Sequence, residues 1–230
     1  MKKLILYILK KRNVNSTINT SISSLTLIHF FTNHFVYILR YLILVIRLKV
    51  KFNGLVLVKS GFKIHGPCVN IGYLSIIDEN VRIQSLIKNS IHIGKSCRIG
   101  FNTDIQSGLL LGDPSGVIKI SDNVGIGPFS HIGGAGNVFI GESTIIGPYF
   151  SVHSENHSFD QNGELYRFQK LKRKGINIGS NCWIGAKVTI LDGVNIGNNS
   201  VIAAGAVVTK SFKDNVLLGG VPARIIKVLE

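Results

Sequence analysis

The chain has 230 residues, of which 45% are hydrophobic and only 17% are charged. This composition excludes an intrinsically disordered chain and suffices for one large core with an extension. The formal net charge is +14, and residues 1–77 carry eleven Lys or Arg side chains and no carboxylate. This asymmetry indicates an N-terminal segment that faces a polyanion, either a nucleic acid or an anionic membrane surface.

Residues 1–52 are predicted to form a basic, apolar helical extension. The opening run MKKLILYILKKR has a short apolar stretch and no small-residue cleavage site, so a secretory signal is not expected. Residues 25–51 predict a long helix that is apolar over most of its circumference. Its one narrow polar stripe recurs every seven positions and consists of Thr26, Asn33, Arg40 and Arg47.

This helix is not expected to cross a membrane. Its uncharged part, residues 25–39, is shorter than the roughly 20 apolar residues that a span requires, and Arg40 interrupts it. We expect a cytoplasmic protein whose residues 1–51 contact the inner membrane surface through apolar burial and basic side chains near acidic lipids. The alternative is a helix that packs its apolar face on the rest of the protein. Nucleic acid is not an expected partner, because the segment lacks the interleaved exposed aromatic and basic residues of a recognition surface.

Between residues 71 and 208 an aliphatic residue returns every six positions. Each hexad contains an inward pair two residues apart, which is strand alternation that lasts only three residues. Gly, Asn or Asp residues follow, and these tolerate tight corners. Three hexads therefore make a triangular coil of about eighteen residues that stacks on the next coil. The predicted triplets are Ile71, Ile77 and Ile83; Ile93, Ile99 and Ile105; Ile120, Ile126 and Ile132; Ile140, Ile146 and Val152; Ile178, Ile184 and Ile190; and Ile196, Ile202 and Val208.

The pattern predicts an all-β chain built as a parallel β-helix over residues 53–212, with a C-terminal segment at 213–230. The three cysteines, Cys68, Cys97 and Cys182, are far apart and form no CxxC pair, which excludes a disulfide framework and a zinc ribbon. Cys97 and Cys182 fall on inward positions, so they are predicted to be small core residues in a reducing compartment.

Three insertions interrupt the ladder. One follows Ile105, a short one follows Ile132, and the longest covers residues 153–177. The longest is polar, contains two histidines, and carries the basic run Lys170, Lys172, Arg173 and Lys174. A loop of this length inside a compact array is usually functional, so we expect the active site there.

Residues 120–227 resemble the hexapeptide-repeat acetyltransferases, particularly the galactoside and maltose O-acetyltransferase branch. The strings that carry the resemblance are GPYFSVHSENHSFD, NGELYRF, INIGSNCWIGAKVTILDGVNIGNNSVIAAGAVVTK and GGVPARIIK. With its basic, apolar N-terminus, the whole chain is similar to acetyltransferases of bacterial surface-polysaccharide clusters. The resemblance implies a left-handed parallel β-helix, a homotrimer with active sites between subunits, acetyl-CoA as donor, a sugar as acceptor and no metal.

The resemblance also implies a general base. In the family, the base is a histidine nine residues after a proline of the preceding coil, and Pro148 assigns this role to His157. A sugar hydroxyl is too weakly acidic to attack a thioester unaided, and an imidazole titrates near neutral pH. We expect direct attack on the acetyl carbonyl without an acetyl-enzyme.

The donor site carries over to positions near the C-terminus. Ala186 and Ala204 match the backbone positions that contact the pantetheine arm, and the Ala186 N–H is a candidate oxyanion donor. The other matches are Thr209 and Lys210, which contact the donor farther along, and Arg224 and Lys227, which meet the nucleotide phosphates. Trp183 matches a family tryptophan near the active site; packing between subunits would explain it equally.

The acceptor side departs from the galactoside pattern. Gly127 and Ala135 stand where those enzymes carry polar side chains, so we expect a different sugar. His153 is expected to be solvated. Glu155 could orient an imidazolium, although the family pattern has no acid at that position.

Three other functions compete with sugar O-acetylation. A sugar N-acetyltransferase would use the same base and donor. A gamma-class carbonic anhydrase would hold zinc between subunits with three histidines, for which His131, His153 and His157 are the candidates. A non-catalytic β-helix scaffold would explain the ladder but neither the polar loop nor the basic C-terminal turn.

Overall fold

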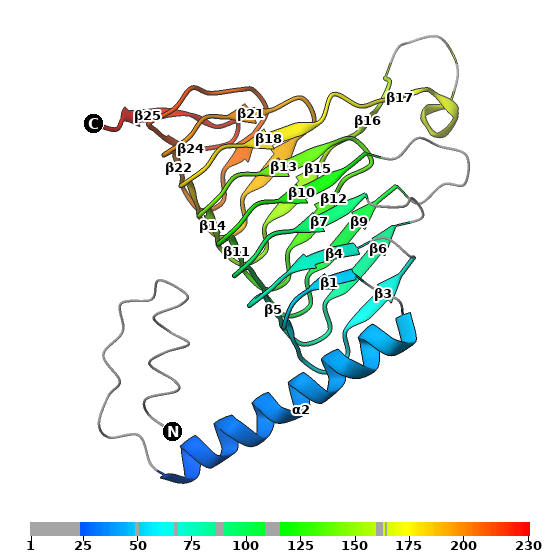
Figure 1. The fold of residues 1–230 in the computed structure, drawn as a ribbon. Coiled ribbons are helices and arrows are strands. Elements are labelled where there is room, and N and C mark those ends of the chain that lie inside the picture. Colours follow the sequence, from blue (N-terminus) through cyan, green and yellow to red (C-terminus); the bar gives the residue numbers. More distant parts are fainter. Residues whose placement is uncertain are drawn as a thin grey trace.

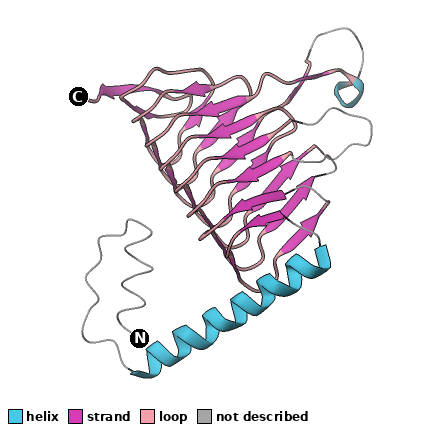
Figure 2. Cartoon of the chain, in the orientation of Figure 1, coloured by secondary structure: helices cyan, strands magenta, loops and turns pink. Residues whose placement is uncertain are grey.

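Three parallel sheets form the sides of a β-helix, with one long helix across one end (Figure 1). The structure is a computed structural model that describes residues 24–48, 51–66, 69–85, 90–108, 116–159, 163 and 165–230. The chain visits the three sheets in turn, so each coil contributes one strand to each sheet (Figure 2).

The strands of each sheet follow in stacking order. The first sheet contains β1 (Lys51–Asn53), β4 (Val69–Gly72), β7 (Ile91–Ile93), β10 (Ile118–Ile120), β13 (Val138–Ile140), β18 (Ile176–Ile178) and β21 (Asn195–Ile196). The second contains β2 (Leu57–Val58), β5 (Ile76–Ile77), β8 (Arg98–Ile99), β11 (Gly125–Ile126), β14 (Ile145–Ile146), β19 (Trp183–Ile184), β22 (Val201–Ile202), β24 (Val216–Gly219) and β25 (Arg224–Val228). The third contains β3 (Lys63–His65), β6 (Arg82–Ser85), β9 (Asp104–Ser107), β12 (His131–Gly133), β15 (Ser151–His153), β20 (Thr189–Leu191) and β23 (Val207–Val208).

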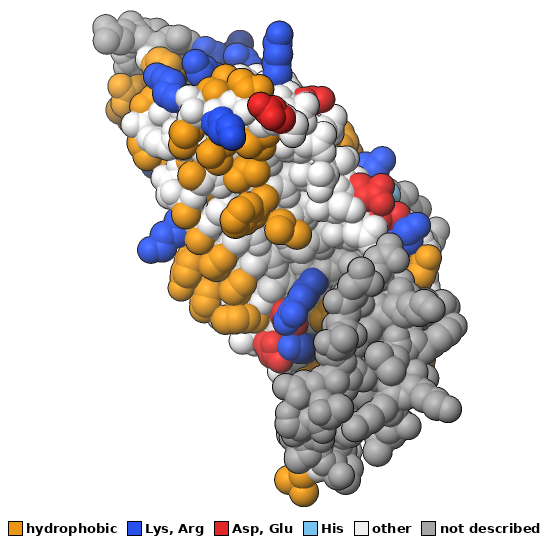
Figure 3. Space-filling view, turned by 90° about the vertical axis from the view of Figure 1, so that its left-hand side faces the viewer, with side chains coloured by type: hydrophobic (Ala, Val, Ile, Leu, Met, Phe, Trp, Pro, Cys, Tyr) orange, Lys and Arg blue, Asp and Glu red, His pale blue; other side chains and the backbone are white. Residues whose placement is uncertain are grey.

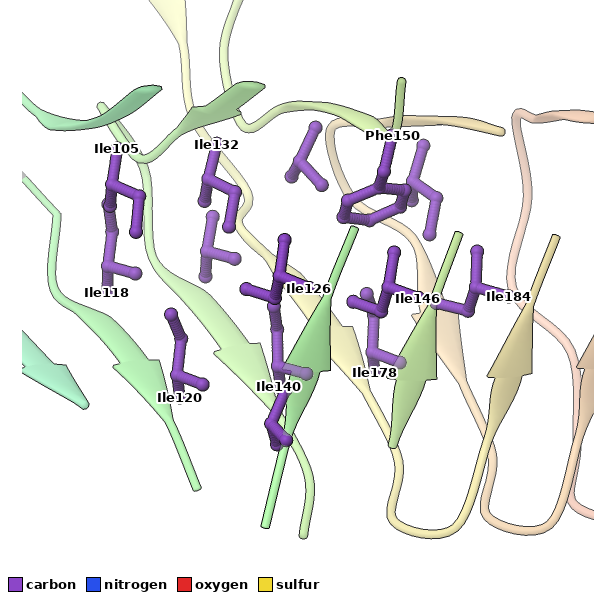
Figure 4. Close-up of a cluster of buried hydrophobic side chains, with 14 of the residues drawn as sticks. Ile105, Ile118, Ile120, Ile126, Ile132, Ile140, Ile146, Phe150, Ile178 and Ile184 are labelled. Atoms are coloured by element: carbon purple, nitrogen blue, oxygen red, sulfur yellow. The ribbon is translucent and has the colours of Figure 1, made fainter. Parts of the chain in front are cut away.

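The predicted ladder is confirmed in full. Every residue of the six triplets is buried, and residues at the same place in successive triplets pair in register, as Ile99, Ile126 and Ile146 do in the second sheet. Figure 4 shows these side chains pointing into the solenoid as stacked columns. Each fully buried aliphatic side chain contributes roughly 1.5–3 kcal/mol, so the stacked columns are the main stabilising element. Cys97 and Cys182 are buried as predicted, whereas Cys68 lies outside the described residues.

One coil precedes those that the ladder predicted. Strand β1 begins at Lys51, two residues before the expected boundary, and β1, β2 and β3 pair with β4, β5 and β6. Val58 and Ile64 continue the inward columns of Ile77 and Ile83.

Several corners differ from the predicted Gly and Asn pattern, and between the first and second sheets Leu74, Ser96 and Ser143 take positive φ. Between the first and second sheets, Asn123, Asn181 and Asn199 take positive φ as expected. Between the second and third sheets, Phe129 and Tyr149 also take positive φ, at 56° and 60°. Their rings stack at 5.1 Å, and this contact between successive coils offsets a backbone conformation that bulky residues rarely adopt.

Helix α2 (Ser24–Leu48) lies across the end formed by the first coil and extends past its edge (Figure 1). Tyr41 and Leu44 pack against the core, and the Tyr41 hydroxyl donates to the Gly54 carbonyl at 2.8 Å. The helix thus closes the apolar interior at this end, as the packing alternative expected. Among the described residues, no helix meets the length and hydropathy that crossing a bilayer requires.

The long insertion and the C-terminus each form a hairpin. Within 153–177, β16 (Asn156–His157) pairs antiparallel with β17 (Leu171–Lys172), and a short 3₁₀ helix spans Tyr166–Phe168. At the opposite end from α2, β24 adds parallel to β22 and then pairs antiparallel with β25.

Candidate active site

A cavity of about 380 Å³ lies between the hairpin β16–β17 and the outer surface of the third sheet. Glu155, His157, Leu171 and Arg173 line it. Side chains alternate between the two faces of a hairpin, so the residue before β16 and the residue after β17 share the face of the His157–Leu171 pair. The insertion therefore places the predicted base, His157, in the wall of this open cavity.

The floor of the cavity comes from the outward positions of the third sheet. Gln106, Gly133 and His153 occupy equivalent positions on successive coils, and His131 lies beside them. Gln106, Gly133 and His153 each follow the third residue of a predicted triplet directly. The ladder register could therefore have identified these residues, which the sequence analysis did not assign to an acceptor site.

Both ends of the insertion are fixed to the solenoid. At the first end, the Ser154 hydroxyl donates to the Gly133 carbonyl at 2.8 Å and accepts from the Gly136 N–H at 2.9 Å. At the second end, the Asp192 carboxylate accepts from the N–H groups of Lys174 and Gly175 at 2.9 and 2.8 Å. These bonds hold the hairpin that carries His157, although the segment lies outside the regular coil.

An ion pair crosses the base of the hairpin. Nε and Nη2 of Arg173 both lie 3.1 Å from Oε2 of Glu155. The Glu155 carboxylate is thus bound by Arg173, and the role of orienting an imidazolium stays a prediction for it. Of the basic run noted in the sequence, only Arg173 lines the cavity. The other members are exposed and do not line it: Lys170, Lys172 and Lys174.

Two histidines lie side by side on the floor. The ring centroids of His131 and His153 are 5.7 Å apart, and His153 Nε2 lies 2.6 Å from the Ser151 hydroxyl. Partial desolvation of its ring, with a smaller contribution from His131, lowers the pKa of His153 and favours its neutral form. His153 was expected to be solvated; it is exposed, but it also lines the cavity. Within the described part of the chain, no three His, Cys, Asp or Glu side chains are grouped to hold a metal ion.

Of the expected donor residues, Ala186 and Ala204 follow a different edge of the solenoid from the cavity, whereas Thr209 and Lys210 follow a strand of the third sheet at the edge where the cavity lies. Ala186 and Ala204 lie on successive coils at the corner between the second and third sheets, where the Gly205 N–H donates to the Ala186 carbonyl at 2.8 Å. Thr209 and Lys210 follow β23 and are exposed, and Arg224 and Lys227 lie exposed on β25. The strands of the third sheet begin at the corner that holds Ala186 and Ala204, and they end at the cavity. Within one chain, this corner and the cavity therefore lie at opposite edges of the third sheet.

The departures from the galactoside pattern have structural reasons. Gly127 packs at a corner where a Cβ atom would lie 2.5 Å from the backbone of Gly147 and Pro148, so no polar side chain fits. Ala135 lines the cavity, and a larger polar side chain at this position would reduce the cavity volume. Trp183 lies on the outer face of the second sheet next to Ile145, and the two side chains are 59% and 55% exposed.

Comparison with known proteins identifies the family. The model described as bacterial transferase hexapeptide (six repeats) matches residues 175–210. Galactoside O-acetyltransferase of Escherichia coli (strain K12) is 37% identical over 139 residues, which are 60% of this chain and 54% of that protein. WbbJ of the same strain, whose name describes O-acetyl transfer in lipopolysaccharide biosynthesis, is 33% identical over 152 residues, 62% of this chain and 78% of that protein. The match thus spans about half the length of the first relative and most of the second.

A solved structure supports the fold. A point mutant of AntD, an N-acyltransferase from Bacillus cereus in complex with dTDP and coenzyme A, superposes with a TM-score of 0.58 at 19% identity, covering 83% of this chain and 89% of that chain. The fold is a left-handed parallel β-helix, as the resemblance implied. The chain belongs to the hexapeptide-repeat acetyltransferase family. The prediction of an acyltransferase is confirmed at the level of the family.

Proposed function

We propose that the chain transfers an acetyl group from acetyl-CoA to a sugar hydroxyl, with His157 as the general base. The observation that carries this proposal is the direction of His157 into a cavity on a fold shared with O-acetyltransferases. His157 takes the hydroxyl proton as the oxygen attacks the acetyl carbon, and the tetrahedral intermediate then expels the CoA thiolate. The imidazolium returns the proton to the thiolate sulfur, so no acetyl-enzyme and no metal is needed.

The donor occupies the corner of the second and third sheets. Acetyl-CoA would run past the stacked backbone of Ala186 and Ala204, with Thr209 and Lys210 farther along. The Ala186 N–H would donate to the oxyanion. Arg224 and Lys227 on β25 would meet the nucleotide phosphates, so that residues 213–230 complete the donor site.

The active unit is a homotrimer. The cavity and the donor corner lie at opposite edges of one chain's third sheet, so a neighbouring chain is needed to bring a base and a donor together. Figure 3 shows hydrophobic side chains gathered along the side of the solenoid that lies at the left of Figure 1. The exposed apolar residues of the second sheet and its flanking corner support an interface there, since patches of this kind mark interaction sites. They are Phe101, Phe129, Ile145, Tyr149 and Trp183.

The acceptor belongs to a bacterial surface polysaccharide, and the enzyme works at the cytoplasmic face of the membrane. The name of WbbJ supports the first statement, and helix α2 supports the second. While one side of α2 closes the solenoid, Phe35, Leu39 and Leu42 remain exposed. This exposed apolar stripe belongs to the N-terminal part of the chain, whose residues 1–77 hold eleven basic and no acidic side chains. The combination suits an anionic lipid surface.

Replacing the base tests the proposed function. His157→Ala should lower kcat for acetyl transfer roughly 10²- to 10⁴-fold, the usual contribution of a general base. The assay follows labelled acetyl-CoA into sugar acceptors and into their amino-sugar counterparts, which also separates O- from N-acetylation. His92→Ala, on the outer face of the first sheet, is the matched control and should retain wild-type activity. Near wild-type transfer by His157→Ala would remove the proposed mechanism.

A further inference from the structure

A polar chain across three coils fixes the orientation of His131 on the cavity floor. Arg82, Asp104 and His131 occupy equivalent positions on β6, β9 and β12. Nε and Nη2 of Arg82 each donate to Asp104, one to each carboxylate oxygen, at 2.7 Å. Oδ2 of Asp104 lies 3.4 Å from Nδ1 of His131. A carboxylate beside Nδ1 favours a proton on that nitrogen, which leaves Nε2 as a hydrogen-bond acceptor.

A missing side chain opens the space in front of this Nε2. A Cβ atom at Gly133 would lie 3.2 Å from His131 Nε2 and 3.1 Å from the Val152 carbonyl oxygen. The backbone φ of Gly133 is not in the left-handed region, so the conformation does not demand glycine. Gly133 instead leaves a notch between Gln106 and His153, and the free nitrogen of His131 faces it.

The charges around the notch are compensated within the protein. Arg82 neutralises Asp104 on the strand next to His131, and Arg173 neutralises Glu155 in the wall. Gln106 Nε2 donates to Oδ2 of Asp104, so the groups left to meet a ligand are the imidazoles and the remaining N–H and carbonyl oxygen of the Gln106 amide. An anionic ligand would find no unpaired cation among these lining groups, whereas hydroxyl groups would find both donors and acceptors.

We propose that the Gly133 notch is the acceptor subsite and that it holds an uncharged glycosyl unit, one of whose hydroxyls donates to His131 Nε2. Gln106 and His153 flank this unit, and the hairpin holds His157 above it. The inference rests on the proposed function, since it places the sugar beside the proposed base. Asp104 is a positioning residue that acts through His131.

Two variants of the full-length chain test the subsite. His131→Phe keeps a planar ring but removes the acceptor nitrogen, and Gly133→Val fills the notch. The probes are the methyl β-glycosides of glucose, galactose and N-acetylglucosamine, which are neutral, and methyl β-glucuronide, which is anionic. Each variant should raise the KM for the neutral glycosides, His131→Phe by about three- to tenfold, as expected for one lost hydrogen bond. The KM for acetyl-CoA should stay within twofold of wild type.

The controls separate folding, donor and acceptor effects. His92→Phe makes the same side-chain change on the first sheet and should leave both KM values unchanged. Thermal unfolding and calorimetric binding of acetyl-CoA show whether each variant is folded. Unchanged glycoside KM values in both folded variants would overturn the subsite. So would preference for the glucuronide, or wild-type protein that binds acetyl-CoA and neither binds nor acetylates any neutral glycoside. A wild-type chain that fails to bind acetyl-CoA would instead overturn the proposed function itself, and the subsite with it.

Discussion

At the scale of single residues, burial decides the chemistry of the core cysteines. Cys97 is fully buried, its thiol donates to the Ser121 carbonyl at 3.0 Å, and burial raises the pKa of this thiol to about 11. Burial also raises the pKa of Cys182. Both thiols therefore stay protonated at neutral pH, and neither is a candidate nucleophile.

The raised pKa of Cys97 makes the free energy of unfolding decrease as the pH rises through the alkaline range. The raised pKa means that the folded state keeps its proton up to about pH 11, whereas the unfolded thiol loses it near 9.0. The protonated thiol's contribution to the free energy of unfolding is thus fully present below pH 9 and is lost as the pH rises to 11. The loss is on the order of 2 kcal/mol. Denaturant unfolding of wild type and Cys97→Ala between pH 8 and 11 should show the steeper decline in wild type. Parallel curves would contradict the assignment.

At the scale of elements, the hairpin that carries His157 depends on the bonds that fix its ends. Asp192→Ala removes the acceptor for the Lys174 and Gly175 N–H groups and should loosen the hairpin that carries His157. We expect kcat to fall roughly ten- to a hundredfold, because small misplacement of a catalytic group is costly. Asp192→Asn keeps an acceptor oxygen and should restore much of the rate.

Asp122→Ala is the control for this prediction. Asp122 accepts the Lys95 N–H at 2.9 Å at a corner remote from the hairpin, so this variant loses the same kind of bond. Its kcat should stay within twofold of wild type while its stability changes comparably. Equal losses of activity in Asp192→Ala and Asp122→Ala would indicate a general stability effect.

The exposed side of α2 gives a second prediction at this scale. Replacing Phe35, Leu39 and Leu42 by Ser should weaken sedimentation with anionic phosphatidylglycerol vesicles, because each residue loses apolar burial. Binding by wild type should decrease with salt and be absent on neutral phosphatidylcholine vesicles. The control replaces Ile225, Ile226 and Val228, exposed apolar residues at the opposite end of the solenoid, and should bind as wild type does. Equal vesicle binding by both triple variants would exclude α2 as the contact.

The elements also show which features a sequence can predict. The ladder was predictable because each hexad repeats the same physical requirement, an inward aliphatic residue before a corner. The first coil was not predicted because a lysine stands next to each of its aliphatic inward residues, Lys59 after Val58 and Lys63 before Ile64. At the remaining position of this coil, Phe52 stands in place of an aliphatic residue. His157 was assigned by resemblance. The pairing of β16 with β17 places Arg173 toward the cavity and Lys172 away from it. This pairing depends on which residues of the long insertion meet, and no local sequence pattern specifies that.

At the scale of the whole molecule, the fold places the proposed base and the proposed donor corner apart within one chain. The third-sheet strands are at most four residues long, yet they set the base and the donor corner on different edges of every chain. The proposed closed trimer would resolve this separation, because rotation would bring the donor corner of one chain to the cavity of the next. The exposed apolar side supplies a surface for that contact (Figure 3).

Subunit complementation tests this arrangement. One variant, His157→Ala, lacks the base, and a second, Arg224→Glu with Lys227→Glu, opposes the donor phosphates; each alone should be nearly inactive at low acetyl-CoA concentration. Random assembly of equal amounts gives each site a one-in-two chance of an intact base and an independent one-in-two chance of an intact donor half. Co-expressed chains should therefore recover about a quarter of the wild-type rate. Sites confined to one chain would recover nothing, because every chain in the mixture carries one of the defects. The measurement needs only labelled acetyl-CoA, an acceptor and a check by sedimentation that the mixed chains assemble.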